Sequence, residues 1–199
     1  GGGHPVRTEW LGNTASGVTA CKYYYVNGTS LAGGSTNYAA GTLSVVRTTD
    51  EDGAVSLTFT DKLGRTVLTR QVDGTSTFSD TYHVYDDRGQ LRFVLQPQYQ
   101  VSANLAQFAF QYTYDDRGNL TKKQLPGTDY VQYVYDTYDR PAYVQDGRRR
   151  AAGTNRWYYY TYDNLGRVVT EGECTGQSNT TSPTVLVTNY YDNYSFAGT

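Results

Sequence analysis

A short motif built on an Asp-x-x-Gly turn recurs along this 199-residue chain and constrains its fold more than any other feature. Three copies are well preserved: Tyr85-Asp86-Asp87-Arg88-Gly89-Gln90-Leu91, Tyr114-Asp115-Asp116-Arg117-Gly118-Asn119-Leu120 and Tyr162-Asp163-Asn164-Leu165-Gly166-Arg167-Val168. Two copies are degenerate, Phe59-Thr60-Asp61-Lys62-Leu63-Gly64-Arg65 and Tyr135-Asp136-Thr137-Tyr138-Asp139-Arg140, and Tyr191-Asp192-Asn193-Tyr194-Ser195-Phe196 resembles a last one. Internal repeats of this kind indicate that one supersecondary unit is used many times.

Turn chemistry explains the residue types in the motif. Asp suits the first position of a type I turn, where its carboxylate accepts backbone N–H groups, and Gly three residues later tolerates a positive φ. Asp139 takes the place of Gly in one copy, because Asp enters the left-handed region more easily than most residues. The Tyr before the turn is typical of a strand. The predicted turn residues are Asp61 and Gly64, Asp86 and Gly89, Asp115 and Gly118, Asp136 and Asp139, and Asp163 and Gly166.

The spacing of these turns favours a chain of β-hairpins over a strict solenoid. The intervals between the aspartates are uneven, and a Gly-containing turn follows several copies after about one strand length. These turns are Val72-Asp73-Gly74, Leu125-Pro126-Gly127 and Gln145-Asp146-Gly147, and Asp50-Glu51-Asp52-Gly53 lies upstream. We therefore predict an all-β fold, an antiparallel β-hairpin meander.

The three preserved copies and the degenerate ones resemble the RHS or YD-repeat family over roughly residues 41–199. Ala39-Ala40-Gly41-Thr42-Leu43, Asp61-Lys62-Leu63-Gly64-Arg65 and Lys123-Gln124-Leu125-Pro126-Gly127 are similar in wording to the version in large secreted proteins of Bacteroidetes. The resemblance implies hairpins joined edge to edge in a curled, extended sheet, part of a β-spiral or shell. It also implies an extracellular or cell-surface bacterial protein, whose sheet wraps a C-terminal toxin domain or forms a surface stalk.

Composition agrees with strands and turns and excludes some partners. The chain contains 21 Tyr and no Met, and its formal net charge is −2. A nucleic-acid partner is not expected, because such proteins present a basic field. No apolar run is long enough to span a bilayer. We expect Cys21 and Cys174 to be separate thiols, because spacing alone specifies no bridge.

Outside the repeats the sequence predicts less regular structure. Residues 1–40 read as an N-terminal irregular leader and a first hairpin, with a strand over 19–26, a turn at Asn27-Gly28 and a Gly/Ser-rich loop over 30–37. Residues 41–199 form the repeat sheet. Helical spacing of apolar residues within 98–109 indicates a short helix or ordered loop. Arg148-Arg149-Arg150 is expected to be a solvated basic tip.

Residues with reactive side chains are explained by structure more readily than by catalysis. Asp86-Asp87 and Asp115-Asp116 resemble paired carboxylates, but both pairs lie in the repeated turn. His83 has no nucleophile pattern beside it. Calcium remains an alternative for the oxygen-rich turns, although no EF-hand spacing is present. We predict a nonenzymatic chain with no catalytic residue, cofactor or metal.

Aromatic residues supply the one candidate ligand site. Trp10, Trp157, Tyr158 and Tyr160, if exposed, are suited to stacking on sugars, which predicts a carbohydrate-binding module of a cell-surface adhesin as the alternative function. The competing interpretation is that these rings pack across strands as the core.

Both ends of the sequence indicate a fragment of a longer protein, whose adjacent repeats are the expected partners. Gly1-Gly2-Gly3 and the incomplete last repeat motivate this interpretation. The strand predicted over 184–191 is apolar and should recruit another strand at its edge or fold back on its own sheet.

Overall fold

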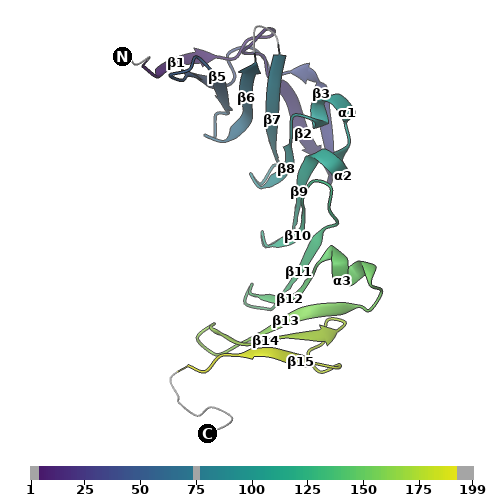
Figure 1. Ribbon diagram of the computed structural model, residues 1–199. Helices are drawn as coiled ribbons and strands as arrows, with labels where there is room; N and C mark the ends of the chain where they lie inside the picture. Colours follow the sequence, from purple (N-terminus) through teal and green to yellow (C-terminus); the bar gives the residue numbers. More distant parts are fainter. Residues whose placement is uncertain (1–4, 74–76, 192–199) are drawn as a thin grey trace. The chain divides into compact units, whose positions relative to one another are not determined.

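The computed structural model describes residues 5–73 and 77–191, and its elements are almost entirely antiparallel strands (Figure 1). Thirteen of the described strands follow a meander in which neighbours in sequence are neighbours in the sheet, with β1 placed beside β4. The all-β prediction is therefore confirmed. The chain divides into two compact units, Gly1–Gln111 and Tyr112–Thr199.

The first unit contains most of one antiparallel series. In sheet order its strands are β1 (Arg7–Gly12), β4 (Ser44–Thr49), β5 (Val55–Thr60), β6 (Thr66–Asp73), β7 (Thr77–Tyr85), β8 (Leu91–Leu95) and β9 (Ala109–Tyr114), the last of which crosses the division. Alternate residues of β5 to β8 point into one core, as the period of two in a strand requires. The largest fully buried side chains there are Phe59, Leu57, Leu68, Tyr82 and Leu95.

A separate hairpin covers that core. It consists of β2 (Lys22–Asn27) and β3 (Ser30–Asn37), and β2 packs against β7. Tyr24 meets Tyr82 edge to face with ring centroids 4.9 Å apart, a favoured aromatic geometry. Two short helices, α1 (Tyr99–Ser102) and α2 (Leu105–Phe108), connect β8 to β9 and lie beside the hairpin in Figure 1. They confirm the interruption predicted within 98–109.

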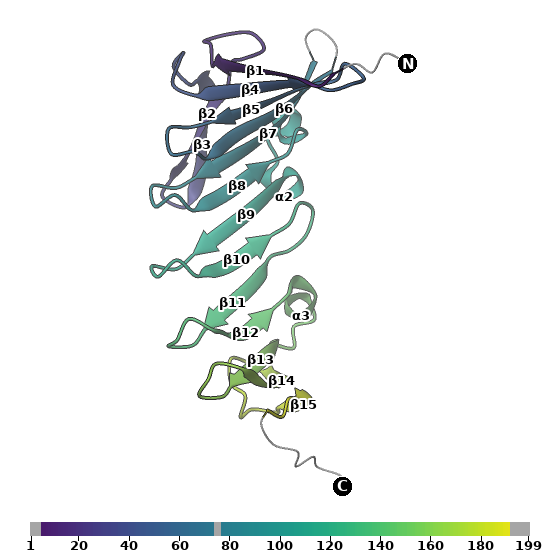
Figure 2. The same cartoon turned by 90° about the vertical axis from the view of Figure 1, so that its left-hand side faces the viewer.

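The second unit is a set of consecutive hairpins (Figure 2). Its strands are β10 (Leu120–Gln124), β11 (Val131–Tyr135), β12 (Pro141–Gln145), β13 (Arg156–Tyr162), β14 (Val168–Thr175) and β15 (Thr184–Thr188), with α3 (Gly147–Ala151) between β12 and β13. Its small core contains Trp157, Tyr159 and Cys174, with Val134 and Tyr143 packed against them.

Two expectations for the N-terminal part are wrong. Arg7–Gly12 is not an irregular leader, because it forms β1 and pairs with β4, with Trp10 opposite Val46. Ser30–Asn37 is not a loop but the strand β3. Its glycines fit the strand because Gly33 has a φ of 90° and a Cβ there would lie 2.3 Å from the Tyr23 carbonyl oxygen. The glycines thus allow the backbones of the paired strands β2 and β3 to approach closely, a role that composition alone does not distinguish from a loop.

The predicted far-side turns have mixed outcomes. Leu125-Pro126-Gly127 is a turn, closed by a hydrogen bond from Thr128 N to the Leu125 carbonyl. Gln145-Asp146-Gly147 instead starts a helix, because the Asp146 side chain caps α3 by accepting from Arg149 N. Gly74, and residues 192–196 of the last repeat copy, lie outside the described residues.

Candidate functional site

The turn at Asp163 shows how one repeat is closed. Asp163 Oδ1 accepts from the backbone N–H groups of Leu165 and Arg167, both at 2.9 Å. Gly166 N donates to the Asp163 carbonyl at 3.0 Å, and Gly166 has a φ of 81°. One carboxylate therefore accepts hydrogen bonds from two backbone amides of the turn, as the type I turn interpretation predicts.

The same turn is present at the other predicted positions. In each, the first Asp accepts from the amides two and four residues later. Gly64, Gly89 and Gly118 have φ values of 78°, 79° and 92°. Asp139 has a φ of 60°, so the prediction that Asp enters the left-handed region at this position is confirmed. The upstream turn at Asp50 follows the same scheme, with Gly53 at a φ of 84°.

A second set of contacts joins each turn to the next repeat. Arg167 Nε donates to Asp163 Oδ2 at 2.7 Å, and its guanidinium lies 4.4 Å from the ring centroid of Tyr191. The Tyr191 hydroxyl donates back to the Val168 carbonyl at 3.0 Å. We call this arrangement of Asp, Arg, Tyr and carbonyl the repeat clasp.

The clasp recurs at fixed offsets in both units. In the first unit, Arg65 binds Asp61 and lies 4.8 Å from the Tyr85 ring, and the Tyr85 hydroxyl donates to Thr66 O at 3.1 Å. In the second unit, Arg140 binds Asp136 and lies 4.4 Å from the Tyr162 ring, whose hydroxyl donates to Pro141 O at 2.7 Å. In each of these copies the acceptor is the fifth residue after the Asp of the preceding turn.

One copy keeps the clasp without the arginine. Asn119 takes the arginine position and donates to Asp115 Oδ2 at 3.1 Å, while the Tyr135 hydroxyl donates to Leu120 O at 2.9 Å. Sequence reasoning assigned the motif Tyr only a strand role and missed its hydroxyl. The constant offset of Tyr and Arg from successive Asp residues is the signal that could have found it.

The hydrogen bonds within the turns lower the pKa values of the turn carboxylates. The backbone N–H of Arg167 lowers the pKa of Asp163, and the Arg167 side chain lowers it further. At Asp136 partial burial acts to raise the pKa, but hydrogen bonds from the side chain and backbone of Arg140 reverse that effect and lower it. These carboxylates are therefore held ionised as acceptors of their own turns.

The side chains that resembled catalytic groups are placed by the fold. Asp86 and Asp115 each use Oδ1 for two amides of their own turn, and Asp87 and Asp116 are exposed at the tips. Burial lowers the pKa of His83, which favours the neutral imidazole. Among the described residues, no group of three or more His, Cys, Asp and Glu is arranged to hold a metal ion.

The candidate sugar-binding residues do not come together. Trp10 is 78% exposed on β1, whereas Trp157 is 5% exposed and its indole N–H donates to Asn155 Oδ1. Trp157 lies in the core of the second unit, as the competing interpretation of these rings has it. Tyr158 is covered by the guanidinium of Arg149, 3.5 Å from its ring centroid. Tyr160 lines a shallow trough with Tyr133 and Tyr162.

The predicted solvated basic tip is found at Arg148, which is exposed, but the prediction is wrong for Arg149 and Arg150. They lie on α3, where Arg149 pairs with Asp146 and Glu173 and Arg150 pairs with Asp129. Arg150 also lies 3.6 Å from the ring centroid of Tyr130. These contacts dock the helix on the neighbouring strands, so the charges serve local structure.

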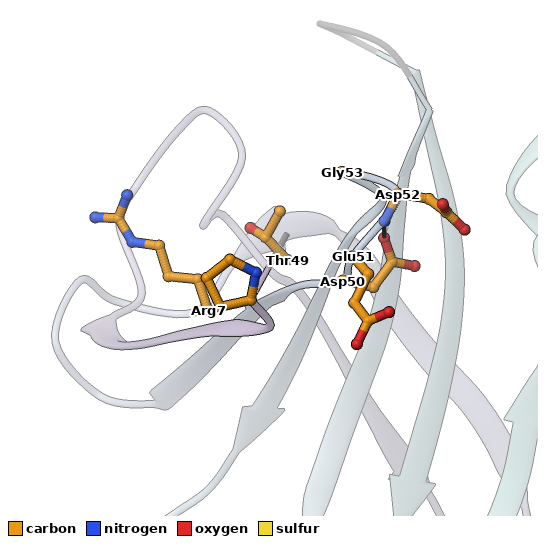
Figure 3. Close-up of a pocket in the computed structure, with 7 residues that line it drawn as sticks. Arg7, Thr49, Asp50, Glu51, Asp52 and Gly53 are labelled. Atoms are coloured by element: carbon orange, nitrogen blue, oxygen red, sulfur yellow. Dashed lines mark hydrogen bonds between the residues drawn. The ribbon is translucent and has the colours of Figure 1, made fainter. Parts of the chain in front are cut away.

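Three consecutive acidic residues, Asp50, Glu51 and Asp52, line a surface hollow at the Asp50 turn. Pro5, Arg7 and residues 49–53 line it, and Figure 3 shows the Arg7 guanidinium directed away from the carboxylates. Asp50 uses its Oδ1 for the amides of Asp52 and Ala54, so the hollow is a by-product of the turn.

The cysteines and the helices add no reactive or membrane-spanning feature. Cys21 and Cys174 are free and buried, which confirms separate thiols. Burial raises the pKa of the Cys21 thiol to about 12, so it stays protonated. Within residues 5–73 and 77–191, the helices are too short to cross a bilayer.

Comparison with known proteins supports the fold and nothing finer. No protein-family description matches the chain, and no curated protein matches it. Solved structures do match: TcdB2-TccC3-TEV has a TM-score of 0.54 and 17% identity, and a Photorhabdus luminescens Tc holotoxin pore has a TM-score of 0.55 and 16% identity. Each match covers 71% of this chain but only 8% of the other. The likeness supports an RHS-like fold.

Proposed function

We propose that this chain is a nonenzymatic structural repeat segment of a large exported RHS/YD-repeat protein. The repeat clasp carries the proposal. It uses the turn carboxylate, the arginine and the tyrosine hydroxyl of successive repeats to hold neighbouring hairpins together, as Asp136, Arg140 and Tyr162 do. Because these polar groups hydrogen-bond to one another, they support a continuous sheet, and few side chains at the turns are left to bind a substrate.

In this proposal the segment forms part of a β-shell or surface stalk. Its partners are the adjacent repeats of the parent chain and, in the shell form, an encapsulated C-terminal toxin domain. Its location is extracellular or on the bacterial cell surface. The fold shared with TcdB2-TccC3 structures supports the shell form, and the local likeness to secreted proteins of Bacteroidetes remains a prediction from sequence.

The test uses the full-length parent protein, with protease protection of its C-terminal region as the measurement. Arg140→Ala combined with Tyr162→Phe should expose that region to cleavage, because both bonds between the two repeats are lost. Leu165→Ser, at a tip residue that is 77% exposed, is the matched control and should change nothing. The shell is rejected if the wild-type protein, the double variant and the control are equally protected. The stalk is rejected as well if the double variant still attaches fully to the bacterial surface.

One observation favours carbohydrate binding as a second candidate. Tyr160, Tyr133 and Tyr162 line the same shallow trough, and aromatic faces suit the C–H faces of sugars. Glycan-array binding that is abolished by Tyr160→Ala, retained by Tyr138→Ala at an exposed turn tip, and accompanied by an unchanged fold would select this function. Binding that is instead abolished by Trp10→Ala would place the site on β1.

A further inference from the structure

A cavity in the first unit combines surplus hydrogen-bond donors with an aromatic wall. It has a volume of about 280 Å³ and lies among the β2–β3 hairpin, strands β6 and β7, and helix α1. Figure 1 shows the hairpin and α1 beside β7. A cavity of this size accommodates a ligand of a few to about ten heavy atoms.

The donors are Lys22 and Gln100. Lys22 Nζ donates to Gln100 Oε1 at 3.1 Å, and the Tyr24 hydroxyl donates to the same oxygen at 3.0 Å. Because an ammonium group only donates, it fixes which end of the amide is oxygen. Gln100 Nε2 is consequently the free end, and it is buried without a hydrogen-bond partner. A buried donor in this state costs free energy until an acceptor arrives.

The cavity also has a surplus positive charge. Asp80 lines it, but both of its oxygens are taken by Arg70 Nε and Nη2 at 2.7 and 2.6 Å, and Oδ2 also accepts from the Tyr82 hydroxyl at 3.1 Å. The remaining charge is that of Lys22, for which the described part of the chain shows only the amide contact and no carboxylate within 4 Å. An incoming anion therefore meets a compensated carboxylate and an uncompensated ammonium.

Two aromatic rings form part of the remaining wall, beside Gly17, Ala20 and Asn37. Phe78 and Tyr82 line the cavity, and Arg70 lies 4.4 Å from the centroid of the Phe78 ring, which holds that ring in place. We propose that this cavity binds a carboxylate that carries a small apolar group, with the carboxylate accepting from Lys22 Nζ and Gln100 Nε2. The carboxylate belongs to a small organic acid or to a peptide. A single water molecule could satisfy the amide but would leave the ammonium without a counter-charge.

Benzoate is the probe, titrated into the full 199-residue chain and followed by two-dimensional NMR. We expect saturable shifts of the Gln100 side-chain amide. Benzamide, which has the same shape without the charge, should bind about tenfold more weakly, as expected when one charge-assisted hydrogen bond is lost. An acetylated, amidated peptide with one Glu, compared with its Gln counterpart, distinguishes a peptide carboxylate from a free acid.

The variant is Lys22→Met, which keeps the aliphatic stem, and the matched control is Lys62→Met at an exposed turn of the same unit. Lys22→Met should weaken benzoate binding about tenfold or more, while Lys62→Met should leave it unchanged. Unchanged backbone spectra would show that both variants remain folded. If Lys22→Met does not fold, Gln100→Met replaces it as the test variant. The proposal is overturned if shifts do not saturate, if chloride alone reproduces them, or if benzamide binds as tightly as benzoate.

Discussion

Replacing Asp80 by Asn should leave the Arg70 guanidinium buried without its counter-charge. The side chains of Arg70 and Asp80 are 6% and 11% exposed, and two hydrogen bonds join them. Arg70 Nη1 also donates to the carbonyls of Val18 and Ala20, at 2.8 and 2.9 Å, which ties the segment before β2 to the sheet. The pair therefore lies at the junction between the hairpin and β6–β7.

The expected cost is large because desolvation of the arginine is no longer offset. Breaking a buried ion pair by removing one partner costs about 3–5 kcal/mol. An exposed pair contributes about 0–1 kcal/mol, so Glu9→Gln, which removes the carboxylate partner of the 73% exposed Arg7 and of the 40% exposed Arg47, is the control in the same unit. With a urea m-value of about 2 kcal/mol/M, Asp80→Asn should lower the unfolding midpoint by about 2 M.

Hydrogen exchange of β6 and β7 amides under increasing urea is the assay, because it reports the first unit alone. The double variant Arg70→Met with Asp80→Leu should recover most of the loss, since no buried charge remains. A cost for Asp80→Asn no larger than that of Glu9→Gln would refute the reasoning, because it would mean that water reaches Arg70. A double variant as unstable as the single one would refute it equally.

Three further predictions concern the second unit and the turns. Tyr162→Phe should cost about 0.5–1.5 kcal/mol by removing the hydroxyl bond to Pro141 O, and urea unfolding followed by Trp157 fluorescence measures it; no change would mean that the clasp contributes nothing. Gly172→Ala should disrupt the pairing of β14, because a Cβ there would lie 2.5 Å from Thr184 O, and loss of amide protection in β15 would show this; intact protection would contradict it. Stability should fall as pH drops below about 3.8, because a carboxyl whose folded pKa is lowered stabilises the fold above its unfolded pKa and loses that contribution as it is protonated. Denaturation midpoints between pH 2 and 6 test this, and Asp163→Asn should flatten the dependence.

The repeated turns and the strands between them could be predicted from sequence because their causes are local. An Asp that accepts amides two and four residues later, followed by a residue at positive φ, needs no contact from elsewhere in the chain. Asp163 and Gly166 illustrate this, and even the substitute at Asp139 obeys the same backbone rule. The strand pattern follows from the turns, because each turn reverses the chain at a fixed point.

Contacts between distant segments could not be predicted in this way. The sequence does not reveal that β1 pairs with β4, since Trp10 and Val46 meet only when a whole hairpin lies between them. It also does not reveal which face of β13 is buried, so both an exposed and a core position stayed open for Trp157, which is buried, and for Tyr160, which lines a surface trough on the opposite face. A period of two fixes that two faces exist, but not which one meets the core.

The sequence by itself determined the repeated Asp turns, the strands between them and the antiparallel meander. The tertiary structure alone decided the cavity of the first unit. Lys22 and Gln100 are separated by 78 residues, whereas the hydrogen bonds of a repeated turn join residues two to four apart. The contact between Lys22 and Gln100 forms only when the β2–β3 hairpin folds over β7. The physical reason is range: turn hydrogen bonds span a few residues and repeat with the motif, whereas a cavity forms where separate elements pack and leave donors without acceptors.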